Sequence, residues 1–163
     1  MSRLTTVLSL TSVLALSGGV ALGATPPPQH GSFAFEDQFT TQPGDPASCS
    51  FPMAVDVQVR GTFTVSTDAQ GEPTRLLVHN HWTGTVSANG RAVIEHAAQN
   101  EVIDLVTGTS TNAGQIHDQA LAGGVVIHDV GLLRFDADGN LTFLAGPHQG
   151  FAGDVSGLCA ALA

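Results

Sequence analysis

The stretch FPMAVDVQVRGTFTV, Phe51 to Val65, decides the fold. Counting from Phe51, every second residue is apolar or glycine, and the residues between them from Asp56 to Thr64 are polar. Successive side chains of a strand point to opposite faces of a sheet, so this rhythm predicts one long strand with one buried and one exposed face. A helix would instead repeat its apolar positions every three to four residues.

Further alternating segments follow at the spacing of hairpins. The dipeptide Asn89-Gly90 is the strongest turn signal, because both residues tolerate the positive φ of a type I′ turn. Together the patterns predict strands over 74–87, 91–98, 101–109, 125–135 and 141–145, turns at 68–73 and 136–140, a loop over 108–114, and a short helix within 154–163.

Strands at this spacing, with no helix between them, predict an antiparallel meander. A sheet of this size must close or fold over itself to cover its apolar face, and 163 residues allow one core. We therefore expect an all-β domain over residues 33–163, built as a small antiparallel up-and-down β-barrel of the lipocalin-like kind with a short C-terminal helix. A two-sheet sandwich is the second choice.

Residues 1–24 contain the parts of a secretory signal peptide: an early Arg3, an apolar run from Leu4 to Leu22, and small residues at 23–24. Serine, threonine and glycine dilute that run, and prolines follow it at once, which favours cleavage over retention as a membrane anchor. The Pro- and Gly-rich residues 25–32 are predicted to form a flexible arm. We expect a secreted, extracellular protein with no membrane contact after cleavage.

The charge is strongly one-signed, with 14 acidic residues against five arginines, no lysine, and a formal net charge of −9. Such a surface repels phosphate backbones, so nucleic acid is excluded as a partner. The sequence leaves the oligomeric state open.

The chain has two cysteines, Cys49 and Cys159, near the two ends of the predicted domain. In an oxidising compartment an isolated pair predicts one disulfide. The alternatives, two free thiols or a metal pair, need reducing conditions or neighbouring ligands, and each cysteine stands alone in the sequence.

Three local motifs carry a family resemblance: Cys49-Ser50-Phe51-Pro52, Gly146-Pro147-His148 and the terminal Leu158-Cys159-Ala160-Ala161-Leu162. With the preceding signal peptide and hairpins, they resemble the small secreted β-barrel proteins of actinobacteria, a family of uncharacterised function. The resemblance implies a barrel pinned by Cys49–Cys159. It carries no assigned activity and no catalytic residues.

The element His79-x-His81 is the most specific chemical feature, since two imidazoles on one face of a strand can chelate a metal ion. The plainer interpretation is two surface histidines on a polar face. Cupins share this element, but the Glu that should follow it and the second cupin motif are absent. Candidates for a third ligand, by residue type only, are His96, His128, Glu95 and Asp104.

Two function classes remain. The first is a barrel that binds a small apolar or amphipathic ligand, lined by Trp82, Phe63 and Phe135, with no cofactor. The alternative is a barrel enzyme, either metal-dependent through His79 and His81 or a cofactor-free cyclase or isomerase. The enzyme needs two or more side chains converging inside the barrel from the set His79, His81, Arg75, Glu95 and Asp104. The apolar pattern around Trp82 predicts that both histidines face outward, which disfavours the enzyme.

Overall fold

The computed structural model describes residues 26–45, 48–121, 124–150 and 153–163, and the predicted signal peptide lies outside these ranges. The elements are β1 (Gln29–Thr41), β2 (Met53–Thr67), β3 (Pro73–Ala88), β4 (Arg91–Asp104), β5 (Ser110–Leu121), β6 (Gly124–Phe135), β7 (Leu141–Ala145) and α1 (Ser156–Leu162). Among these residues no helix has the length and apolar character needed to cross a membrane.

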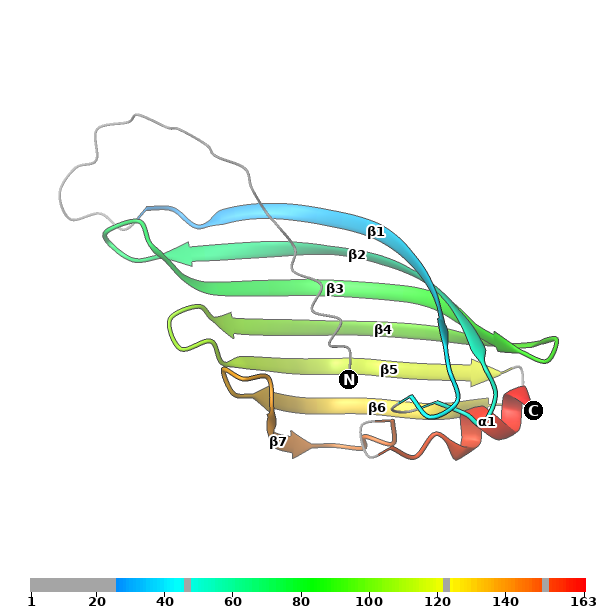
Figure 1. Cartoon of the computed structure of the whole chain (residues 1–163). Helices are drawn as coiled ribbons and strands as arrows, with labels where there is room; N and C mark the ends of the chain where they lie inside the picture. The colour runs from blue at the N-terminus through cyan, green and yellow to red at the C-terminus, as the bar shows by residue number, and fades with distance from the viewer. Residues whose placement is uncertain (1–25, 46–47, 122–123, 151–152) are drawn as a thin grey trace.

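The strands follow one another around the sheet in chain order, each antiparallel to the next (Figure 1). They form an antiparallel β-barrel with one short C-terminal helix. The predicted up-and-down barrel is therefore confirmed, rather than the sandwich. Short turns between neighbouring strands explain this order, because a hairpin can only join antiparallel partners.

Strand β2 shows the alternation that its sequence predicts. Met53, Val55 and Val59 are buried, whereas Asp56 and Arg60 between them are exposed. We call the side of the sheet that carries Met53, Val55 and Val59 the inner face, and the side that carries Asp56 and Arg60 the outer face. The strand register then assigns the residues of every other strand to one of these two faces.

Three boundaries differ from the sequence prediction. The first strand begins at Gln29, which pairs with Val65, so residues 29–32 belong to β1 and not to a flexible arm. The predicted loop over 108–114 mostly belongs to β5, because its polar residues pair with strands on both sides. The segments 91–98 and 101–109 are largely one strand, β4, which ends at Asp104.

The predicted turn at Asn89-Gly90 is confirmed, with φ of 52° and 76° at its two residues. Asn89 also contacts the C-terminal helix, because its Nδ2 donates a hydrogen bond to the carbonyl oxygen of Leu162 at 2.9 Å. The hairpin between β3 and β4 is thereby tied to the end of the chain.

The main apolar core lies at the end of the barrel that carries α1. Leu158 and Leu162 of the helix pack on inner-face residues that include Val55, Val93 and Ile127. The predicted disulfide is present, with an S–S distance of 2.03 Å between Cys49 and Cys159. The helix therefore covers the inner face at this end, and a covalent bond holds it there.

Candidate functional site

Polar side chains interrupt the inner face in the middle of the barrel. The register places Glu95 opposite Gln119, and Glu101 opposite Asn112. Asn80 of β3 lies on the same face, one row away from Glu101. These five residues, which we call the inner polar cluster, come from β3, β4 and β5. They form two separate pairs with Asn80 between them, because Glu95 and Glu101 lie six residues, about 20 Å, apart along β4. A buried polar group is costly unless it is paired, so each needs an explanation.

Glu95 and Gln119 are the most deeply buried members of the cluster, with exposed fractions of 5% and 4%. The Nε2 of Gln119 donates to a carboxylate oxygen of Glu95 at 3.4 Å. This bond directs the amide nitrogen toward the carboxylate. Within the described residues, the buried Oε1 of Gln119 has no hydrogen-bond partner.

The second pair behaves in the same way. Burial raises the pKa of Glu101, and a hydrogen bond from the Asn112 side chain partly offsets this rise in pKa. The amide nitrogen of Asn112 is thus turned toward the carboxylate. In the part of the chain that the structure describes, the buried Oδ1 atoms of Asn112 and Asn80 accept no hydrogen bond. The cluster therefore presents three amide oxygens with free acceptor capacity.

The raised pKa of Glu101 predicts a pH-dependent effect of the substitution Glu101→Gln. Burial destabilises the charged carboxylate, so this unfavourable contribution is complete above the raised pKa and disappears below the usual value of 4.5. We expect Glu101→Gln to be more stable than the natural protein at neutral pH, with the difference narrowing toward pH 4. Thermal unfolding at several pH values measures this. The matched control is Glu36→Gln, at the exposed Glu36. If the stability difference between Glu101→Gln and the natural protein widened in acid, the raised pKa assigned to Glu101 would be wrong.

The three aromatic residues predicted to line a ligand site all lie on the inner face. Trp82 pairs with Val59, Phe63 pairs with Val78, and Phe135 pairs with Ser110. Each of the three is only partly buried. The structure thus places them around the inner polar cluster, in separate rows of the sheet.

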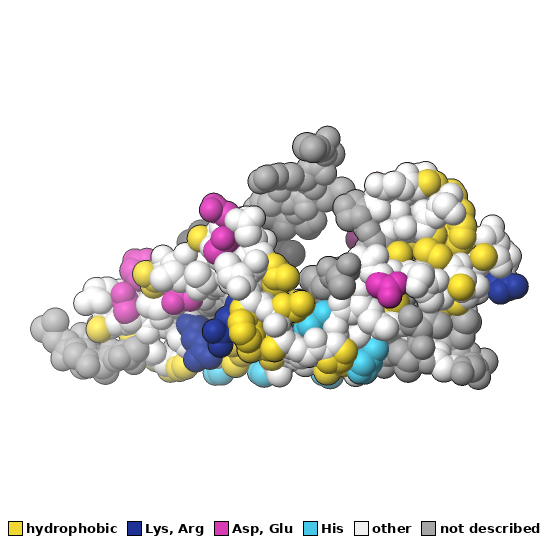
Figure 2. Space-filling view, turned by 90° about the horizontal axis from the view of Figure 1, so that it is seen from below, with side chains coloured by type: hydrophobic (Ala, Val, Ile, Leu, Met, Phe, Trp, Pro, Cys, Tyr) yellow, Lys and Arg dark blue, Asp and Glu magenta, His cyan; other side chains and the backbone are white. Residues whose placement is uncertain are grey.

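One row of the inner face contains three glycines, together with Phe33, Asn80 and Gln99. Gly61 lies opposite Asn80, and Gly114 lies opposite Gly131 across the neighbouring strands. The ring of Phe33 packs over Gly61, where an added Cβ would lie 2.5 Å from a ring carbon. Seen from below, the molecule is hollowed between the end that carries α1 and the opposite end (Figure 2).

The histidines predicted to bind metal lie on the outer face. His79 and His81 are both exposed, and the Nδ1 of His79 forms a hydrogen bond with the Oδ1 of Asn100. Of the third-ligand candidates, Glu95 faces the opposite side of the sheet. Among the described residues, no group of three or more His, Cys, Asp or Glu side chains is placed to hold a metal ion. A site at these two histidines would need a ligand from elsewhere.

The remaining candidates for metal binding or catalysis also lie apart from one another. His96 and His128 are exposed outer-face residues, and Asp104 accepts hydrogen bonds from the backbone of Val106 and Thr107 in its own loop. Arg75 pairs with Asp104 at the edge of the outer face. The enzyme hypothesis needs at least two of five named side chains inside the barrel, and of these five only Glu95 lies on the inner face.

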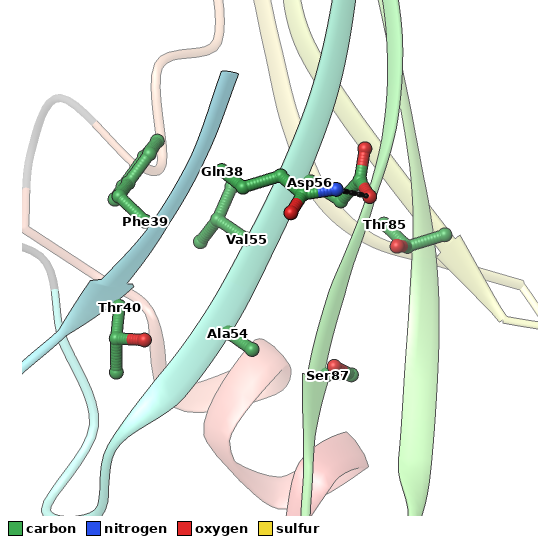
Figure 3. Close-up of a pocket in the computed structure, with 8 residues that line it drawn as sticks. All are labelled: Gln38, Phe39, Thr40, Ala54, Val55, Asp56, Thr85 and Ser87. Atoms are coloured by element: carbon green, nitrogen blue, oxygen red, sulfur yellow. Dashed lines mark hydrogen bonds between the residues drawn. The ribbon is translucent and has the colours of Figure 1, made fainter. Parts of the chain in front are cut away.

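Two shallow hollows of about 390 Å³ and 350 Å³ lie over β1, β2 and β3, mostly on the outer face. In the larger one, the Nε2 of Gln38 donates to Asp56 at 2.7 Å, with Thr85 beside them (Figure 3). Gln38 and Asp56 are therefore already paired with each other. None of the aromatic residues predicted to bind a ligand lines either hollow.

Two further buried polar residues have a structural role. Asp129 is 1% exposed and accepts a hydrogen bond from the backbone N–H of Gly150 at 3.0 Å. His148, 6% exposed, pairs with Asp129 as an isolated bridge, and its Nε2 lies 3.0 Å from the carbonyl oxygen of Ala145. Together they fix the segment after β7 against β6.

Sequence reasoning missed most of the inner polar cluster. Glu95 and Glu101 have the same parity in β4 as the apolar Val93 and Ile103, so the signal was a polar interruption of an apolar stripe. In β5 a bulge after Gln115 changes which residues face inward, and this hides Asn112 and Gln119 from a search for strict alternation. Comparison with protein-family models, with curated proteins and with solved structures found no match to this chain.

Proposed function

We propose that this protein binds a small amphipathic molecule against the inner face of its barrel. One observation carries the proposal: the inner face combines partly buried aromatic residues with buried amide oxygens that lack partners in the described structure. Binding sites for small molecules are typically concave and apolar, with a few converging polar groups. A bound molecule would cover the aromatic rings and supply the missing hydrogen bonds.

We also propose that the chain works outside the cell. The Cys49–Cys159 disulfide supports an oxidising compartment. The signal-peptide pattern of residues 1–24 and the resemblance to small secreted actinobacterial proteins support export. A ligand-binding barrel of the lipocalin-like kind suits this setting, because it needs neither energy nor a cofactor to bind its ligand.

The only tryptophan, Trp82, gives a direct test. Titration with N-phenyl-1-naphthylamine, an uncharged amphipathic fluorophore, is expected to quench Trp82 emission by energy transfer and to raise the emission of the probe, with saturation at one molecule per chain. His81→Ala on the outer face is the control and should bind equally well. Probe emission that stays at its value in buffer, with Trp82 unchanged, would contradict the proposal.

The alternative of a barrel enzyme stays a prediction. Glu95 and Glu101 place two carboxylates on the inner face. His79 and His81 lie on the other face, so the metal-dependent version gains no support from the geometry.

A further inference from the structure

Strand β1 has one free edge. It is hydrogen-bonded to β2 on one side, and no described strand pairs with its other side, which forms the upper margin of the sheet in Figure 1. We propose that this edge pairs antiparallel with β1 of a second copy of the chain, with Phe33 at the two-fold axis. The two copies would then share one continuous sheet.

The length and regularity of β1 suit it to such pairing. Native sheets protect their edges with short strands, lysine, proline or a bulge, because an unpaired edge accepts a matching strand. β1 has 13 residues, contains no lysine or proline, and pairs with β2 without a bulge. None of its residues is buried, and the inner-face Phe35 is 49% exposed. The strand therefore retains the surface that a neighbour would cover.

The register determines which backbone groups point to the free edge. The two-residue turn Asn89-Gly90 makes Ala88 and Arg91 a hydrogen-bonded pair. The direction of hydrogen bonding alternates along a strand, so counting from this pair across β3 and β2 assigns the odd-numbered residues of β1 to bonds with β2. The backbone groups of the even-numbered residues face the free edge: His30, Ser32, Ala34, Glu36, Gln38 and Thr40.

The two ends of this row select one register of the symmetric pair. With Phe33 opposite Phe33 of the second copy, Gln38 comes to face Pro28 of that copy. Neither residue has an N–H to donate there, because proline has none and the N–H of Gln38 already donates to the Asp37 carboxylate at 2.9 Å. The pairing therefore spans residues 29–37 and stops where the donors end.

The polar side chains are complementary in this register. On the outer face, His30 lies opposite Glu36 of the second copy, and the symmetry makes this contact twice. The Nδ1 of His30 forms a hydrogen bond with the hydroxyl of Thr64 at 2.9 Å, which leaves Nε2 to reach the carboxylate. On the inner face, the Asp37 carboxylate lies opposite the side-chain amide of Gln29 of the second copy. Cross-strand pairs of opposite charge stabilise a sheet, and like charges destabilise it.

Apolar side chains line the inner face of the same contact. The rings of Phe33 and Phe35 stack in one chain, with their centroids 6.3 Å apart. In the proposed register the two Phe33 side chains meet at the axis, and Phe35 lies opposite Gly31 of the second copy. The ring of Phe63 packs over Gly31, so Phe35 meets an aromatic ring there. Association would cover aromatic surface that the single chain exposes.

The other free edge of the sheet is a poorer partner. β7 has only five residues, Leu141–Ala145, against the nine that β1 offers to its own copy. Pairing of β1 with β7 of another copy would also join unlike edges, which adds chains without limit unless a ring closes. Pairing of β1 with itself ends at the dimer.

Sedimentation equilibrium of the natural protein tests the proposal. We expect a monomer–dimer equilibrium with a Kd on the order of 100 µM, since nine residues a side are well below the roughly 20–30 of a stable interface. A single monomeric species up to about 1 mM, or growth beyond the dimer, would overturn it. At about 1 µM the chain is monomeric, so thermal unfolding of Glu36→Gln is measured without this contact.

A proline substitution locates the contact. Ala34→Pro removes an N–H that faces the free edge and not β2, so β1 should stay in its sheet while the Kd rises at least about tenfold. Thr40→Pro is the matched control, because it makes the same change beyond the paired residues and should leave the Kd within about twofold. Circular dichroism and thermal unfolding check that both are folded. Equal weakening by the two variants, or none by Ala34→Pro, would contradict the proposed contact.

A charge reversal tests the register without altering the backbone. His30→Glu places like charges opposite one another and should raise the Kd several-fold. Adding Glu36→Lys restores opposite charges with their signs exchanged and should return the Kd to near its natural value. Positions 30 and 36 face each other in this register alone, so a double variant that associates no better than His30→Glu would show the register to be wrong.

Discussion

Replacing both cysteines, as Cys49→Ser together with Cys159→Ser, is expected to lower the free energy of unfolding by about 4–5 kcal/mol. The disulfide joins residues 110 positions apart, so its loss returns a large conformational freedom to the unfolded chain. The effect on the native state adds to this, because Cys49 is 3% exposed and Cys159 lies on α1. Equilibrium unfolding in urea measures the change.

A helix of seven residues is too short to be stable alone, so α1 depends on this bond and on its packing. We expect the double variant to lose α1 first, with exposure of Val93 and Ile127 on the inner face. Reduction of the natural protein with dithiothreitol is the control that breaks the same bond without substitution. A loss below about 1 kcal/mol in both experiments would show that the disulfide contributes little to the fold.

The substitution Gly131→Ala is expected to destabilise the protein by about 2–4 kcal/mol. Gly131 has a φ of 144°, a conformation that residues with a side chain rarely adopt. An added Cβ would lie 2.0 Å from the carbonyl oxygen of Ala145 and 3.0 Å from Nε2 of His148. Because a backbone atom is the obstacle, β7 would have to move away from β6.

The matched control for this prediction is Gly139→Ala in the turn before β7. Gly139 also has a positive φ, 79°, but an added Cβ meets no atom within 4 Å. Its substitution should cost only the conformational penalty of about 1 kcal/mol. Urea unfolding of both variants separates the backbone conformational penalty, which both share, from the clash of the added Cβ with Ala145, which only Gly131→Ala has. Equal losses of unfolding free energy at the two positions would contradict the close approach of β7 to Gly131.

The regular alternation of β2 and β3 was enough to predict an antiparallel all-β domain, with the barrel as first choice and the sandwich as second. Side chains of period two, separated by short turns, leave few other ways to bury one face. The turn at Asn89-Gly90 was predictable for the same local reason, since few residues accept its φ values. The disulfide was also predictable, because the sequence offers Cys49 only one partner, Cys159.

The edges of the fold were harder to predict. Polar residues such as Ser110 and Asn112 have no strong preference for strands, and it is their pairing with β4 and β6 that makes them part of β5. Likewise, residues 29–32 form a strand because β2 is long enough to pair with them. Such tertiary contacts cannot be read from a local pattern.

The candidate site likewise has one part that could be predicted from the sequence and one part that could not. Trp82 and Phe63 could be assigned to the inner face by parity alone. Glu95, Asn112 and Gln119 could not be recognised as one cluster, because they lie on two strands, and a bulge in β5 changes the parity between the last two. The sequence drew attention to His79 and His81 instead, which the structure places on the outer face.

The most direct test of the central claim is an NMR titration of the ¹⁵N-labelled protein with N-phenyl-1-naphthylamine. If the inner face binds the ligand, the largest shifts will be those of the Trp82 indole N–H and of the side-chain amides of Asn80, Asn112 and Gln119, while Asn100 beside His79 stays unchanged. If Asn100 and the outer-face residues shift and the four inner side chains do not, the ligand binds elsewhere and the account is wrong.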